Sequence, residues 1–181
     1  QSIMDMIFAV QPEAKTIGIV YTTSEPNSVY SIGIYEDLAA DYGFTIEAIG
    51  VTAQSEVTQA VDTLISQGVD CLSNLTDNNV VGVLGSILEK TNEVGIPVYG
   101  SEIEQVELGC VAGAGLDYVQ LGIQTGKMAA QILTGEAACA DLPYETIENY
   151  GLYVNSSALT EMGLTLPDDV AQTAEEVGPT A

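Results

Sequence analysis

The chain has 181 residues, of which 46% are hydrophobic and 16% charged, so it can bury a sizeable core and is too apolar to be disordered. Acidic residues outnumber basic ones by 26 to 3, and the resulting formal charge of −23 disfavours binding to nucleic acid or to anionic lipid. The chain contains neither histidine nor arginine, which excludes a histidine base and an arginine anion clamp.

The three cysteines predict neither a metal site nor a disulfide framework. Cys71, Cys110 and Cys139 form no CxxC motif and have no histidine partner, and their number is odd. Cys71 and Cys110 lie in apolar runs and are predicted to be buried thiols. We therefore expect no metal and no cofactor. No apolar run approaches the roughly 20 residues that a membrane-spanning helix needs.

The first predicted element is a helix over residues 3–10, which ends before Pro12. No secretory signal precedes it, so we expect the chain to begin inside a longer protein. From Lys15 onward, apolar runs alternate with amphipathic helical patterns that end at Gly43, Gly68 and Gly95. The runs at 16–22, 44–51, 69–75 and 96–100 are typical of strands buried on both faces. These strand–loop–helix steps predict an α/β fold with a doubly wound parallel sheet.

The second half of the chain is less regular. We predict a strand at 106–114, a helix at 117–133, a strand at 148–154, a short helix at 156–162 and a polar tail from Pro167. Charged residues between Glu102 and Glu107 interrupt the alternation of apolar strands and amphipathic helices. We therefore expect the chain to cross from one lobe to another near residues 103–108.

Polar turns follow the first, third and fourth predicted strands, at residues 24–28, 76–79 and 101–102. Ligands of open parallel sheets bind beyond such strand ends. With the strand order 2-1-3-4, the first two turns would face each other across one crevice. Ser28 is predicted as a helix N-cap whose free N–H groups attract a carboxylate, and Asp77 could receive an ammonium group. Together they describe a site for an amino acid zwitterion. The candidate ligand-binding residues are Glu25, Asn27, Ser28, Thr76, Asp77, Asn78, Ser101 and Glu102.

Each of these residues also has a simpler interpretation. Ser, Asn and Asp are preferred helix caps, Glu25-Pro26 could be only a turn, and Glu102 could be a solvated acid. Enzymatic interpretations find little support, because the chain has no GxSxG elbow, no Walker loop and no GxGxxG after its first strand. Gly113-Ala-Gly115 is interpreted as a packing feature. We therefore expect no catalytic activity.

Ordered blocks along nearly the whole chain resemble one family. They are PEAKTIGIVYTTSEPNS (12–28), VDCLSNLTDN (69–78), IPVYGSE (96–102), GLDYVQLGIQTGKMAAQILTGE (115–136), LPYE (142–145) and VNSSALTEMGLTLP (154–167). These blocks are similar to the TrpX-like, or tryptophan/tyrosine-type, substrate-binding proteins of ABC importers.

The resemblance implies a two-lobed periplasmic-binding-protein type I fold with most of the N-terminal lobe missing. Residues 1–104 and 150–181 would form the second lobe, and 105–149 would return to the first. The resemblance also implies an extracytoplasmic location as a lipoprotein or periplasmic protein, an aromatic amino acid as ligand, and an ABC permease as partner. Ligand residues would include Asn27, Ser28, Asp77, Asn78 and either Ser101 or Glu102.

Two further expectations concern partners. Elements that return to an absent lobe would expose apolar surface, so this chain is predicted to dimerise through them. Without tryptophan, an aromatic ligand would stack on Tyr21, Tyr30, Tyr99 or Tyr118. The alternative function is a ligand-sensing module of a regulatory or signalling protein with the same fold.

Overall fold

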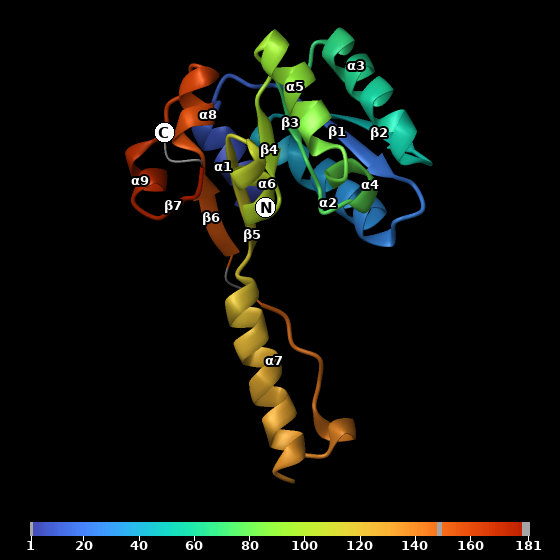
Figure 1. The fold of residues 1–181 in the computed structure, drawn as a ribbon, viewed down its shortest axis with the longest axis vertical. Coiled ribbons are helices and arrows are strands. Elements are labelled where there is room, and N and C mark those ends of the chain that lie inside the picture. Colours follow the sequence, from blue (N-terminus) through green and yellow to red (C-terminus); the bar gives the residue numbers. More distant parts are fainter. Residues whose placement is uncertain (1, 148–149, 179–181) are drawn as a thin grey trace.

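The computed structural model describes residues 2–147 and 150–178, and its core is one mostly parallel sheet in the order β2-β1-β3-β4-β5-β6-β7 (Figure 1). Adjacent strands from β2 to β5 pair in parallel, β6 is antiparallel to β5, and β7 is parallel to β6. The strands are β1 (Thr16–Thr22), β2 (Thr45–Val51), β3 (Cys71–Ser73), β4 (Val98–Gly100), β5 (Ala112–Leu116), β6 (Tyr150–Val154) and β7 (Glu175–Glu176). This confirms the predicted fold class and the 2-1-3-4 order of the first strands.

Helices cover both faces of the sheet and create two hydrophobic cores, as the apolar runs on the strands predict. One core joins the sheet to α1 (Ser2–Val10), α2 (Pro26–Tyr42) and α8 (Ser156–Glu161). The other joins it to α3 (Val57–Gln67), α4 (Asn78–Val81), α5 (Leu84–Val94) and α6 (Ile103–Leu108). Gly43, Gly68 and Gly95 end α2, α3 and α5 in the left-handed conformation, which confirms their role as helix stops.

Three elements differ from their prediction. The expected third helix is divided into α4 and α5, with Gly82 and Val83 between them. The expected strand at 106–114 is the helix α6 followed by the shorter β5, because Ile103 and Val106 have helical spacing and pack against the second core. The expected polar tail contains α9 (Asp168–Ala171) and β7. Residues 148–149 of the expected strand, Gln1 and residues 179–181 lie outside the described residues.

Residues 103–116, around the predicted lobe crossing, continue the architecture of the preceding residues. β5 pairs with β4 in the sheet, and α6 packs against the second core through Val106, so the chain leaves the sheet after Leu116. From there α7 (Tyr118–Leu133) projects away from the body of the molecule, and a segment containing a short 3-10 helix (Cys139–Asp141) runs back toward β6 (Figure 1). α7 has no buried residue, so its apolar side chains are left uncovered.

Cys71 and Cys110 are buried free thiols, as predicted, whereas Cys139 is exposed. Within residues 2–147 and 150–178, no group of side chains could hold a metal ion. In the same part of the chain, no helix combines the length and the apolar character that crossing a membrane requires.

Candidate functional site

The polar turns after β1 and β3 meet at the carboxyl edge of the sheet, as the strand order predicts. The hydroxyl of Ser28 donates a hydrogen bond of 2.7 Å to Oδ2 of Asp77. Asn27 Nδ2 donates to the backbone oxygen of Thr76 at 3.0 Å. The carboxylate of Glu25 accepts from the backbone N–H of Asn78 at 3.1 Å. The two turns are therefore tied together by side chains from both.

Asp77 is completely buried and its carboxylate is already occupied by protein donors. Oδ2 accepts from the N–H of Thr22 and the hydroxyl of Ser28, both at 2.7 Å. Oδ1 accepts from the hydroxyl of Thr22 at 2.7 Å and from the N–H groups of Asn79 and Val80 at 3.2 Å. The last two bonds make Asp77 the N-cap of α4.

These hydrogen bonds also set the ionisation of Asp77. Burial alone would raise its pKa, but the bonds from Ser28, from the N–H and hydroxyl of Thr22 and from Val80 together outweigh burial and lower the pKa below its ordinary value. Asp77 is thus a buried, ionised residue that joins β1, α2 and α4.

Ser28 does not occupy the position predicted for it. α2 begins at Pro26 with Glu25 as N-cap, so Ser28 lies inside the first turn of the helix. It is 1% exposed and its hydroxyl points to Asp77. The first turn of α2 therefore lies beside the carboxylates of Glu25 and Asp77, which disfavours a ligand carboxylate there.

The third turn, after β4, is tied to the second in the same way. The hydroxyl of Ser101 donates to the backbone oxygen of Asn74 at 2.7 Å. Glu102 accepts at Oε1 from Nε2 of Gln105 (3.1 Å) and at Oε2 from the hydroxyl of Tyr118 (3.3 Å). Burial, followed by the charge and the hydrogen bond of Glu102, raises the pKa of Tyr118, so this tyrosine remains a neutral donor.

A cavity of about 730 Å³ opens beside these turns, and we name it the cleft cavity. Among the described residues, its walls combine hydroxyl and apolar groups with the carboxylate of Asp5. The lining residues are Ser2, Ile3, Asp5, Ser31, Ile34, Tyr35, Leu75, Thr76, Ser101, Ala114, Gly115, Leu116, Tyr118 and Tyr150. The side chains of this described lining that could donate a hydrogen bond to a ligand anion are hydroxyl groups.

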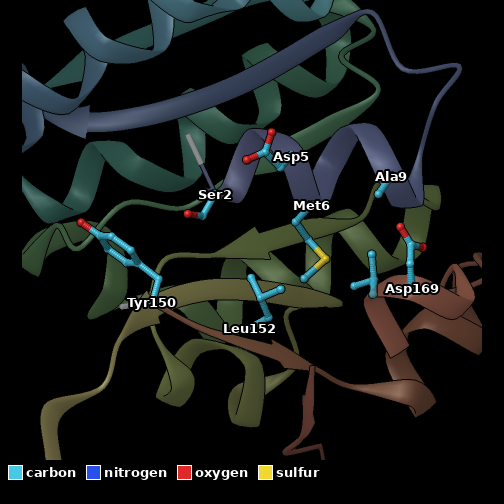
Figure 2. Close-up of a pocket in the computed structure, with 8 residues that line it drawn as sticks. Ser2, Asp5, Met6, Ala9, Tyr150, Leu152 and Asp169 are labelled. Carbon is cyan, nitrogen blue, oxygen red and sulfur yellow. The ribbon is translucent and has the colours of Figure 1, made fainter. Parts of the chain in front are cut away.

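A second cavity of about 680 Å³ adjoins it between α1, β6 and α9, and Figure 2 shows its lining. Ser2, Asp5 and Tyr150 line both cavities. In Figure 2 the side chains of Met6 and Leu152 point toward one another from α1 and β6 and form an apolar floor. The hollow at this edge therefore continues from the strand ends along α1.

The predicted residues divide into two groups. Thr76 and Ser101 line the cleft cavity, and Glu102 borders it through Tyr118. The other predicted residues, which are Glu25, Asn27, Ser28, Asp77 and Asn78, bind one another or the neighbouring turn.

Sequence reasoning missed several lining residues. Asp5 and Ser2 lie on α1, where the pattern predicted only a packing helix, and Tyr150 is the first residue of β6. Ser31 is one turn beyond the first polar loop, so helical spacing from Asn27 or Ser28 could have indicated it.

Comparison with known proteins identifies the family. The model of the ABC transporter substrate binding protein family matches residues 1–178, and the chain belongs to this family. Among characterised relatives, it is 30% identical over 161 residues to a tyrosine-binding protein of Clostridioides difficile strain R20291, which covers 89% of this chain and 46% of that protein.

Two solved structures give the same result. One is an ABC domain in complex with L-Trp from Streptococcus pneumoniae, with a TM-score of 0.85, 30% identity, and coverage of 96% of this chain and 58% of that one. The other is the ligand-free, open structure of a substrate-binding protein with adhesive properties from Clostridium difficile, with a TM-score of 0.78, 32% identity, and coverage of 98% and 59%. The chain thus spans about half the length of these relatives.

Proposed function

We propose that this chain is part of the solute-binding component of an ABC importer and that it forms one wall of a cleft for an aromatic amino acid. The observation that carries the proposal is the cleft cavity, which lies at the carboxyl edge of the sheet in a chain of the substrate-binding family. Its volume of about 730 Å³ is ample for one amino acid, even if a second lobe occupies part of it. The relatives that bind tyrosine or tryptophan support the ligand class.

Glu102 is the residue that we assign to the ligand ammonium group, in place of Asp77. The carboxylate of Asp77 is buried and holds five protein donors, so it has no room for a sixth. Glu102 is only partly buried and holds one donor on each oxygen, which leaves free acceptor capacity. Asp5, which lies on α1 and lines the cleft cavity, is the competing carboxylate.

The aromatic side chain of the ligand has two tyrosines to pack on. Tyr118 is 47% exposed and Tyr150 is 53% exposed, and both line the cleft cavity beside Ile34 and Leu116. A tyrosine ring offers an apolar face together with a hydroxyl, which suits an aromatic amino acid. Of the tyrosines predicted for stacking, Tyr118 is the one placed at the cavity, whereas Tyr99 is completely buried.

The test is calorimetric titration of the intact receptor with L-tyrosine, L-tryptophan, L-leucine and D-ribose. We expect saturable binding of the two aromatic amino acids and none of the pentose, and binding of ribose alone would refute the proposal. Glu102→Gln is expected to weaken L-tyrosine binding at least tenfold, because a neutral amide replaces the charge that faces the ammonium group. Asp5→Asn is the matched control and should change affinity less than threefold. The reverse result would move the ammonium site to α1.

The mechanism that we propose involves no covalent chemistry. Contacts of one ligand with two lobes favour the closed arrangement, and the closed receptor delivers the solute to a membrane permease. Such a receptor acts outside the cytoplasm, and we propose anchoring as a lipoprotein or a periplasmic location. Family membership favours this role over the regulatory sensor.

We further propose that α7 belongs to the first lobe in the intact receptor. Its exposed apolar residues need a partner, and these include Val119 (71% exposed), Ile123 (46%) and Leu133 (86%). In the 181-residue chain alone, a second copy would cover them, so we expect a concentration-dependent dimer in light scattering. Ile123→Glu with Leu133→Glu should give a monomer. A monomer at high concentration without these substitutions would contradict the proposal.

A further inference from the structure

Gln105, on α6, is a completely buried polar side chain next to the proposed site. Its Oε1 accepts from Nδ2 of Asn74 and from the N–H of Ser101, both at 3.0 Å. Its Nε2 donates to the backbone oxygen of Leu75 at 3.2 Å and to Oε1 of Glu102 at 3.1 Å. The amide therefore makes four hydrogen bonds and uses both of its donors.

The orientation of this amide is fixed by backbone groups. The N–H of Ser101 can only donate and the carbonyl of Leu75 can only accept, so Oε1 must face the first and Nε2 the second. Rotating the amide by half a turn would break both bonds inside the protein. Nε2 is consequently always directed at Glu102.

These bonds join two walls of the cleft cavity. Leu75 lies in the turn after β3, whereas Ser101 and Glu102 lie in the turn after β4. The end of β5 packs against the other side of the turn after β4. A Cβ added to Gly115 would lie 2.7 Å from Cα of Glu102, so only glycine permits this close approach. The backbone of Glu102 is thus held by β5, and its side chain by Gln105.

We propose that Gln105 is a positioning residue for ligand binding. It is too deeply buried to touch the ligand, and it acts by holding one oxygen of the Glu102 carboxylate, whose other oxygen accepts from Tyr118, a residue that lines the cleft cavity. This proposal rests on the proposed function, in which Glu102 receives the ligand ammonium group. It adds a buried amide that decides where that carboxylate points.

A double-mutant cycle on the intact receptor tests the proposal, with L-tyrosine as the probe. Gln105→Met keeps the size of the side chain and removes its hydrogen bonds, and we expect at least a tenfold loss of affinity. In the Glu102→Gln background the same substitution should cost less than twofold, because the carboxylate that Gln105 positions is already absent. Equal losses in both backgrounds would show a merely structural role and overturn the proposal.

A ligand-free measurement separates this proposal from the proposed function. In a crystal structure of Gln105→Met without ligand, we expect the Glu102 carboxylate to leave the Tyr118 hydroxyl, and an unmoved Glu102 would overturn the proposal. If Gln105→Met does not fold, Gln105→Glu keeps the acceptor for Ser101 and loses the donor to Glu102, and it is used in both experiments. Failure of the unsubstituted receptor to bind any aromatic amino acid would refute the proposed function, and the ligand-free structure would still decide the role of Gln105.

Discussion

Replacing Asp77 by asparagine should destabilise the protein far more than the same substitution at an exposed aspartate. An asparagine side chain keeps one oxygen for the Thr22 hydroxyl and the two N–H groups at the start of α4. The other oxygen becomes an NH₂ group, which faces the N–H of Thr22 and can no longer accept from it. One buried backbone donor is then unsatisfied, and the three remaining bonds lose their charge.

The expected loss is about 2–4 kcal/mol of the free energy of unfolding, from about 1–3 kcal/mol for the unsatisfied N–H and the rest from weakened bonds. For a chain of this size, each kcal/mol lowers the melting temperature by about 2–4 °C. Urea unfolding followed by circular dichroism at pH 7 measures the change.

Asp70→Asn is the matched control. Asp70 also connects β3 to β1, since its Oδ2 accepts from the N–H groups of Lys15 and Thr16 at 2.7 and 2.8 Å, but it is exposed at the other edge of the sheet. One asparagine oxygen can keep both bonds, so the expected loss is below about 1 kcal/mol. Equal effects of the two substitutions would refute the reasoning about the buried carboxylate.

The pH dependence gives an independent check. Because the pKa of Asp77 is lowered in the folded protein, the unfolded chain binds a proton first as the pH falls, and stability drops. The stabilisation is fully present above about pH 4, near the ordinary pKa of aspartate, and is lost as the pH falls through the lowered folded value. The difference between the unsubstituted protein and Asp77→Asn should therefore be constant from pH 7 to 5 and shrink below about pH 4.

Two further predictions concern the thiols and the helix ends. Burial raises the pKa of the Cys110 thiol to about 12, and it also raises the pKa of Cys71. A thiol reagent at pH 8 should therefore label only Cys139 in the native protein and all three cysteines in urea. Fast labelling of a second thiol in the native protein would contradict the described burial. Gly68→Ala should lower the free energy of unfolding in urea by about 1 kcal/mol, because φ is 78° at this residue. Gly33→Ala lies inside α2 with open space around it and should raise the free energy of unfolding by about 0.5–1 kcal/mol. The same sign for both changes would refute the assignment of Gly68 as a left-handed helix stop.

The sequence alone predicted the first four strands of the sheet and, with the common order 2-1-3-4, the meeting of the turns after the first and third. Continuous apolar runs, helical periodicity and glycine stops are local signals, and together they give the strand–helix alternation that limits the possible topologies to a few. With the order 2-1-3-4, the turns that contain Ser28 and Asp77 had to meet. The short helix α6 was misread because six residues are too few to show a helical period against a strand-like run.

Only the tertiary structure decided which polar residues are available to a ligand. Asp77 looked free in sequence, yet its donors come from Thr22 and Ser28, which precede it by 55 and 49 residues. Gln105 looked like part of a charged break, yet its side chain bonds residues 30 and 31 positions earlier. Hydrogen-bond capacity is used up by neighbours in space, and these depend on the register and packing of strands distant in sequence. The identity of a side chain tells what it can bind, and the fold decides what it has already bound.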